Sequence, residues 1–128
     1  MYMKQEVQVK GVPVSKAPYS QGILADKFAF IAGQGPTDPH TGKAPDGIEA
    51  QTRAVIKKIE ALLEASGSDM EHIVKTTVFL SDLSDYSGMN KVYQELIPSP
   101  YPSRSTVGAQ LLGGILVEIE VIALIKQW

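Results

Sequence analysis

Two carboxylates in the last apolar segment, Ile115 to Ile125, are the residues best placed to do chemistry. In a β-strand, successive side chains alternate between faces, so Glu118 and Glu120 would point the same way, about 6.6 Å apart. At that spacing they can share a site or divide roles, one chemical and one structural. An ionised carboxylate among apolar neighbours costs several kcal/mol unless a cation or hydrogen-bond donors compensate it. The two glutamates therefore need a partner.

Arg104, in the segment YPSRSTVG, is the cation that best fits this requirement. If residues 105–110 and 115–125 form an antiparallel hairpin, the even-numbered residues of the preceding segment would share the face of the two glutamates. An Arg–Glu pair of this kind is either a structural ion pair at a subunit contact or a catalytic pair. The spacing alone leaves both interpretations open.

Other polar residues give weaker signals. Tyr19 could be a core or interface tyrosine with its hydroxyl at the surface, and Asn90 an exposed helix residue. His40 and His72 match no metal-ligand spacing, so no metal is expected. The GQG at residues 33–35 lacks the third glycine and the following helix of a dinucleotide site, so no organic cofactor is expected either.

Hydrophobic periodicity predicts the elements that must position these residues. Alternating or β-branched apolar residues predict six strands, at residues 5–9, 22–26, 27–32, 73–80, 105–110 and 115–125. Apolar residues three and four apart predict a helix over residues 48–66, closed by Gly67, and a second helix over residues 86–97. This order predicts an α+β fold with one mixed sheet and both helices on one face. The other face would need a cover, which favours self-association.

Composition narrows the class of protein. The chain has 128 residues, of which 44% are hydrophobic, and this predicts a single domain over residues 1–128. Its formal charge of −2 has the wrong sign for a protein that neutralises phosphates, so no nucleic acid is expected. It contains no cysteine and no signal-like or membrane-spanning apolar run, so we expect a cytoplasmic protein without membrane contact.

Five segments together resemble the RidA/YjgF family of reactive intermediate deaminases. The segments are APYSQG at 17–22, IAGQGPTDPHTG at 31–42, VKTTVFLSDLSDY at 74–86, YPSRSTVG at 101–108 and VEIEVIA at 117–123. The resemblance extends over nearly the whole chain in order and spacing. It implies a chorismate-mutase-like α+β sandwich assembled as a homotrimer, in which the sheets form a central barrel and the helices lie outside.

The resemblance also implies an activity and a place for it. Family members hydrolyse 2-imino acids such as 2-iminobutanoate and 2-iminopropanoate, and their enamine tautomers, to 2-oxo acids and ammonia without a metal or organic cofactor. The substrate lies in clefts between neighbouring subunits. Arg104 matches the arginine that binds the substrate carboxylate, and its planar guanidinium suits that group. Glu118 matches the glutamate that positions and activates water.

The remaining site residues also come from the resemblance. Tyr19 matches a tyrosine that lines the cleft, Gly33 a glycine whose backbone approaches the ligand, and Asn90 a polar residue near the pocket. The backbone carbonyl of Thr106 would hold water, although many members have cysteine there. Ala32 stands where many members have serine, which removes a hydroxyl from the cleft.

Two other functions compete with the deaminase interpretation. A non-catalytic trimer that binds small 2-oxo acids or amino-acid metabolites would use the same arginine. Ribonuclease activity has been attached to family members, but this chain is acidic and lacks a row of basic residues interspersed with aromatic ones, which argues against that activity.

By the same resemblance, Glu120 is expected to be structural and to tie strands or subunits together.

Overall fold

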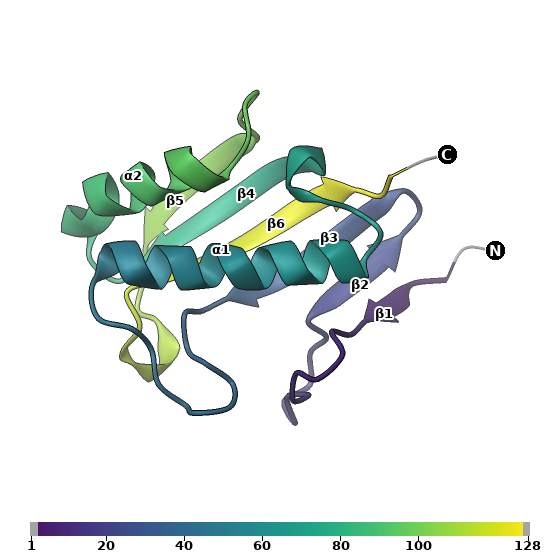
Figure 1. Cartoon of the computed structure of the whole chain (residues 1–128), viewed down its shortest axis with the longest axis horizontal. Helices are drawn as coiled ribbons and strands as arrows, with labels where there is room; N and C mark the ends of the chain where they lie inside the picture. The colour runs from purple at the N-terminus through teal and green to yellow at the C-terminus, as the bar shows by residue number, and fades with distance from the viewer. Residues whose placement is uncertain (1–2, 127–128) are drawn as a thin grey trace.

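One six-stranded sheet organises residues 3–126, the part of the chain that the computed structural model describes (Figure 1). Its strands are β1 (Gln5–Val7), β2 (Gly22–Ala25), β3 (Phe28–Gln34), β4 (Ile73–Leu80), β5 (Ser103–Gly108) and β6 (Val117–Leu124). Their spatial order is β1-β2-β3-β6-β4-β5. Neighbours are antiparallel except β4 and β5, which are parallel, so the sheet is mixed as predicted.

Two helices, α1 (Ile48–Ala65) and α2 (Tyr86–Leu96), lie side by side on one face of the sheet (Figure 1). Short 3-10 turns precede β4, α2 and β6, namely η1 (Met70–His72), η2 (Leu83–Asp85) and η3 (Leu112–Gly114). The α+β architecture, with both helices on one face, agrees with the prediction. No helix within residues 3–126 is long and apolar enough to cross a membrane.

The end of α1 confirms the role predicted for Gly67. Gly67 has a positive φ of 76°, a conformation that glycine adopts without steric cost. The N–H of Ser68 donates to the carbonyl of Leu63 at 2.8 Å, and the N–H of Gly67 to that of Glu64 at 3.1 Å. This bonding pattern is a Schellman motif, which satisfies carbonyls that the helix itself leaves free and then turns the chain towards β4.

The core lies between the helices and one face of β6. Val117, Ile119, Val121 and Ala123 all point to the helical side and are at most 2% exposed. Burying side chains of this size stabilises the fold by about 1.5–3 kcal/mol each for valine and isoleucine. The alternation along the last apolar segment therefore predicts this central strand correctly.

The opposite face of the sheet is also apolar but remains open to solvent in the single chain. The large apolar side chains on this face are half-buried or exposed. They include Ile23, Phe28, Phe30, Phe79, Ile122 and Leu124. Phe30 is 41% exposed, and its ring centroid lies 6.2 Å from that of Phe28. An apolar sheet face of this kind is typical of a surface that another layer covers.

The predicted hairpin of residues 105–110 with 115–125 is wrong. Strand β5 begins two residues earlier, at Ser103, and pairs in parallel with β4, whereas β6 inserts between β3 and β4. The physical reason is the difference in hydrophobicity between the two strands. β6 has one wholly apolar, buried face and takes a central position, whereas β5, which exposes Ser103, Ser105 and Val107, takes the edge.

We predict that Gly88→Ala destabilises the fold, because Gly88 lets α2 approach the start of α1. A Cβ at Gly88 would lie 2.5 Å from Cγ2 of Ile48, which has little freedom to move. Overpacking costs about 1–3 kcal/mol and exceeds the gain of up to about 1 kcal/mol from replacing a helical glycine. Urea unfolding should show a lower free energy of unfolding for Gly88→Ala but not for Ser87→Ala, its exposed neighbour. Equal stability of both variants would contradict the close packing of the helices.

Candidate functional site

Arg104 extends from the edge strand β5 towards α2, where two side chains hold its guanidinium group. Nη1 donates a hydrogen bond to Oδ1 of Asn90 at 2.8 Å, and Nη2 donates to the hydroxyl of Tyr86 at 3.1 Å. Both partners lie on α2, which packs across the sheet beside this strand. The arginine side chain is therefore fixed in direction before any ligand arrives.

Two tyrosine rings support the same guanidinium. Its central carbon lies 4.8 Å from the ring centroid of Tyr93 and 5.6 Å from that of Tyr86, within the range of cation–π contacts. Tyr93 is 5% exposed, and its hydroxyl shares a 2.8 Å hydrogen bond with Oγ1 of Thr76 on β4. The Tyr93 ring is thereby locked between the core and the arginine.

The electrostatics of the two tyrosines differ because their surroundings differ. Burial raises the pKa of Tyr93, although its hydrogen bond to Thr76 and the charge of Arg104 act in the opposite direction. A hydrogen bond from the Asn90 side chain, followed by the charge of Arg104, lowers the pKa of the exposed Tyr86 phenol. The arginine therefore favours negative charge in its immediate surroundings.

This arrangement suits an anion with two oxygen atoms. A guanidinium has five N–H groups, and Asn90 and Tyr86 accept one each, so the other three have no hydrogen-bond partner among residues 3–126 and can bind a ligand. They border a shallow recess of about 460 Å³, which is lined by Asn90, Tyr93, Gln94, Tyr101, Pro102 and Arg104. Parallel N–H groups of this kind recognise a carboxylate with two hydrogen bonds, which a lysine cannot do.

Glu118 lies on the open face of the sheet, against the backbone of Gly33. A Cβ at Gly33 would lie 2.9 Å from Cδ of Glu118 and nearer still to its Oε2, so only glycine leaves room for the carboxylate there. Within residues 3–126, the Glu118 carboxylate takes part in no hydrogen bond or ion pair. It is half-buried and free to meet a group from outside the chain.

An irregularity in β3 creates this contact. Ile31 pairs with Val121 and Gln34 pairs with Ile119, so three steps along β3 correspond to two along β6, as in a β-bulge. Ile31 and Gln34 consequently both face the helices, although an odd spacing would place them on opposite faces of a regular strand. Gly33 is left on the open side beside Glu118.

The prediction that Arg104 and Glu118 share a face of the sheet is wrong. Arg104 pairs with Thr76, which is buried under the helices, whereas Glu118 pairs with Phe79 on the open face. The cause is the parallel pairing of β5 with β4, because an edge strand set against β4 takes its alternation from β4. Within one chain, the two residues belong to opposite sides of the sheet.

The other predicted residues fall into the same two groups. Thr106, two residues beyond Arg104, faces the helices with it, and Asn90 contacts Arg104 directly. Tyr19 lies in the segment before β2, where it is 53% exposed and touches neither group. Glu120 is exposed opposite Thr77 and forms no ion pair with any residue from 3 to 126.

The sequence analysis missed Tyr86 and Tyr93, although a signal was present. Together with Asn90 they occupy positions i, i+4 and i+7 of the predicted second helix, a spacing that places three side chains on one face.

Within the described residues, no group of three or more His, Cys, Asp or Glu side chains is arranged to hold a metal ion.

The fold and the clamped arginine define a class of two-layer α+β proteins with an exposed sheet face and an arginine-lined recess at the sheet edge. Comparison with known proteins names it. The family described as Endoribonuclease L-PSP matches residues 10–125. The chain therefore belongs to this family, the RidA/YjgF family that its motifs resemble.

Named relatives cover nearly the full chain. A RutC family protein of Pyrococcus horikoshii is 43% identical over 123 residues, 94% of this chain and 98% of that protein. The 2-iminobutanoate/2-iminopropanoate deaminase of Salmonella typhimurium is 34% identical over 125 residues, 94% and 98% of the two chains. The crystal structure of E. coli TdcF with bound serine superposes with a TM-score of 0.85 at 32% identity, over 94% and 98% of the two chains.

We predict that Arg104→Leu raises the pKa of the Tyr86 phenol, because the substitution removes a positive charge and a hydrogen bond that favour the phenolate. NMR titration of a tyrosine-labelled sample would measure it, with Tyr86→Phe identifying the resonance. Arg53→Leu, which removes an exposed arginine from α1, should leave the Tyr86 pKa unchanged. An unchanged pKa in Arg104→Leu would show that the arginine is not held against Tyr86 in solution.

Proposed function

We propose that the protein hydrolyses 2-imino acids to 2-oxo acids and ammonia, at sites that two copies of the chain build together. The observation that carries this proposal is the Arg104 guanidinium, which α2 holds in place with three N–H groups to spare. The deaminases of Salmonella typhimurium and of Capra hircus, 34% and 35% identical to this chain, support the reaction class. Suitable substrates are 2-iminobutanoate and 2-iminopropanoate.

Arg104 would bind the substrate by its carboxylate. Two parallel N–H groups would fix both oxygens and so orient the adjacent C=N carbon. Asn90 and Tyr86 would prevent the guanidinium from turning away, and the backbone carbonyl of Thr106 would accept a hydrogen bond from water near the same carbon. This arrangement reduces the freedom of the substrate before the chemical step begins.

Glu118 would act as the general base and then as the acid. Its carboxylate takes a proton from water as the water oxygen bonds to the imine carbon, and it returns this proton to the imine nitrogen, which gives a carbon bearing both hydroxyl and amino groups. Glu118 then takes the hydroxyl proton and passes it to the amino nitrogen, the C–N bond breaks, and ammonia leaves as the C=O bond forms. One water is consumed, and Glu118 ends in its initial state.

The two halves of the site would meet between copies, since they lie on opposite faces of one sheet. Gly33 and Glu118 would come from one copy and Arg104, Asn90 and Thr106 from the next, with Tyr19 at the rim of the cleft. The apolar open face supports such packing, because association would remove it from water. A closed homotrimer with the sheets inside and the helices outside satisfies both requirements.

Binding without turnover is the second candidate function. It is favoured by the structure of E. coli TdcF, which holds serine, a small carboxylate. The same clamped arginine would then take up 2-oxo acids or amino-acid metabolites. Calorimetry with 2-oxobutanoate, in a protein that fails to release ammonia from imines, would establish this alternative.

We predict that the protein accelerates release of ammonia and 2-oxobutanoate from 2-iminobutanoate generated in situ by a threonine dehydratase. Arg104→Ala should lower kcat/KM by about 100-fold or more through loss of charge-assisted hydrogen bonds. Glu118→Gln should lower kcat by about 100-fold to 10,000-fold through loss of the base. Arg53→Ala and Glu120→Gln serve as matched controls with near-normal rates. Wild-type protein that leaves release unchanged would disprove the deaminase proposal.

A mixing experiment would test whether two copies share each site. Arg104→Ala and Glu118→Ala chains should each have little activity alone, but co-expressed chains should regain turnover, because a mixed assembly would pair an intact Arg104 with an intact Glu118 of its neighbour. Random mixing restores about a quarter of the sites if each takes one residue from each of two neighbours. Mixed assemblies as inactive as the single variants would place both residues in one chain.

Gly33→Ala should reduce turnover with little loss of stability. The new methyl group would displace the end of the Glu118 side chain, which can rotate, so the fold can adapt while the carboxylate loses its position. Kinetics and thermal unfolding on the same preparation separate the two effects. A variant with normal kcat would mean that the contact between Gly33 and Glu118 is irrelevant to the reaction.

A further inference from the structure

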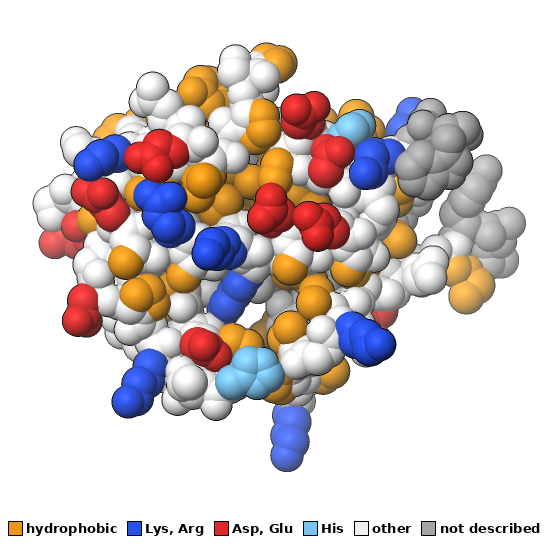
Figure 2. Space-filling view, viewed as in Figure 1, with side chains coloured by type: hydrophobic (Ala, Val, Ile, Leu, Met, Phe, Trp, Pro, Cys, Tyr) orange, Lys and Arg blue, Asp and Glu red, His pale blue; other side chains and the backbone are white. Residues whose placement is uncertain are grey.

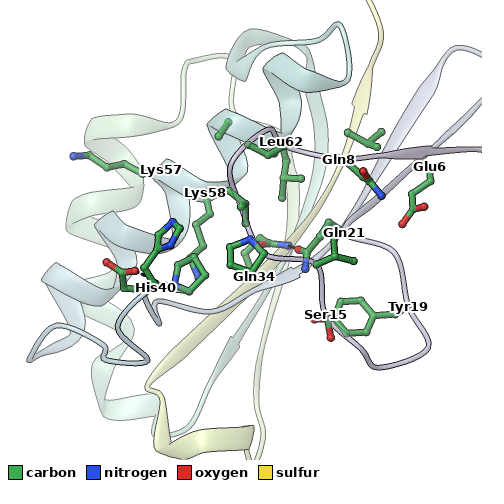
Figure 3. Close-up of a pocket in the computed structure, with 18 residues that line it drawn as sticks. Glu6, Gln8, Ser15, Tyr19, Gln21, Gln34, His40, Lys57, Lys58 and Leu62 are labelled. Atoms are coloured by element: carbon green, nitrogen blue, oxygen red, sulfur yellow. Dashed lines mark hydrogen bonds between the residues drawn. The ribbon is translucent and has the colours of Figure 1, made fainter.

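A second cavity, unrelated to the Arg104 recess, opens on the helical side of the sheet. It measures about 430 Å³ and lies between α1, the segment around β1 and the loop after β3. Figure 2 shows the hollow on this face, among interspersed acidic and basic side chains, and Figure 3 shows its lining. It shares no lining residue with the Arg104 recess, and its size is typical of small-molecule sites.

The walls of this cavity are largely apolar. Valines of the N-terminal segment face the side of α1 across the hollow, and the main apolar residues are Val7, Val9, Val12, Val14, Ala61 and Leu62. Val7 and Leu62 are both nearly inaccessible to solvent. A hydrocarbon group placed between these residues would leave water, at a gain of about 0.8 kcal/mol per buried CH₂.

Lys58 is the only half-buried charged side chain that lines the cavity within the described residues. Its Nζ donates to the carbonyl of Thr37, which leaves other N–H groups of the ammonium available. Burial lowers the pKa of Lys58, and the charge of Asp38 offsets this in part. No carboxylate of residues 3–126 is within ion-pairing distance, since Asp38 instead accepts from the N–H of His40 at 2.8 Å. The ammonium thus lacks a close counter-charge.

A pair of glutamine side chains adds a second donor. Gln34 is 6% exposed, and its Nε2 donates to Oε1 of Gln21 at 3.1 Å and to the carbonyl of Ala32 at 2.9 Å. The amino group of Gln21 therefore stays free of hydrogen bonds to the described residues, as Figure 3 allows the reader to follow. Lys58 and Gln21 both line the cavity, and both carry N–H groups that can donate to an acceptor placed there.

We propose that this cavity binds a small monocarboxylate with an apolar tail. The carboxylate would accept from Lys58 and Gln21, and the tail would lie between the valines and Leu62. An anion fits better than a cation, because Glu6 and Asp38 are exposed at the rim whereas the charge inside is positive. Tyr19, which the proposed function places at the rim of the catalytic cleft, also lines this cavity, so the two sites would be neighbours in the proposed assembly.

Hexanoate is a suitable probe, and Arg104→Ala protein is the right background, since that substitution removes the other carboxylate site. Calorimetry or NMR titration should show saturable binding of one hexanoate per chain, with a Kd of about 1 mM or tighter. Hexan-1-ol, which lacks the charge, should bind at least about tenfold more weakly. Because no turnover is measured, failure of the deaminase proposal leaves this result unaffected.

Two further substitutions assign the binding to the cavity. Lys58→Met keeps most of the length of the side chain but removes its charge, and it should weaken hexanoate binding about tenfold or more. Ala61→Phe should fill the cavity and abolish binding. Lys91→Met, which changes an exposed lysine of α2 outside the cavity lining, is the matched control and should bind as the parent does.

Three results would overturn the proposal. The first is an absence of saturable binding up to about 20 mM hexanoate, well above the expected Kd. The second is binding that survives in folded Ala61→Phe, which places the probe elsewhere. The third is equal affinity for hexanoate and hexan-1-ol, which excludes a charged ligand. Circular dichroism checks that each variant is folded, and Ala61→Phe keeps the test decisive if Lys58→Met unfolds.

Discussion

The parallel pairing of β5 with β4 is the constraint on which the rest of the site depends. It makes Arg104 follow the alternation of β4, so the guanidinium turns under the helices and meets α2. The antiparallel partner of β4 on its other side, β6, sends Glu118 to the open face. One sheet thus separates the Arg104 guanidinium from the Glu118 carboxylate.

Tyr93 links the stability of the core to the geometry of the arginine. Its ring is packed among buried residues, its hydroxyl bonds to Thr76, and its face supports the Arg104 guanidinium. Because Tyr93 is packed in the core, the guanidinium that it supports is positioned by the whole hydrophobic core rather than by a loop. The same logic explains why α2 lies so close to α1, since Gly88 permits the contact that sets the position of the second helix.

Local patterns predicted most of the elements, and non-local pairing accounts for the main errors. The alternation of β6, the periodicity of α1 and the terminating Gly67 are properties of neighbouring residues, and the structure confirms them. The position of β5 depends on which strand it meets across the sheet, which no short segment specifies. For the same reason, Arg104 and Glu118 could be selected as chemical candidates by type, whereas their faces, the tyrosine clamp and the bulge of β3 required the structure.

The bulge in β3 has a consequence for how this chain tolerates change in length. Because three residues of β3 span two of β6, the strand alternates out of phase on either side of Ala32 and Gly33. Loss or gain of one residue there would turn Gly33 and Gln34 to the opposite faces of the sheet. Gly33 would then no longer lie against Glu118, and Gln34 would no longer line the second cavity. The turn-rich segment that follows, residues 35–47, contains no strand or helix, so a change in its length does not turn any side chain to the other face of the sheet. Insertions and deletions should therefore be common after β3 in related chains and rare within it.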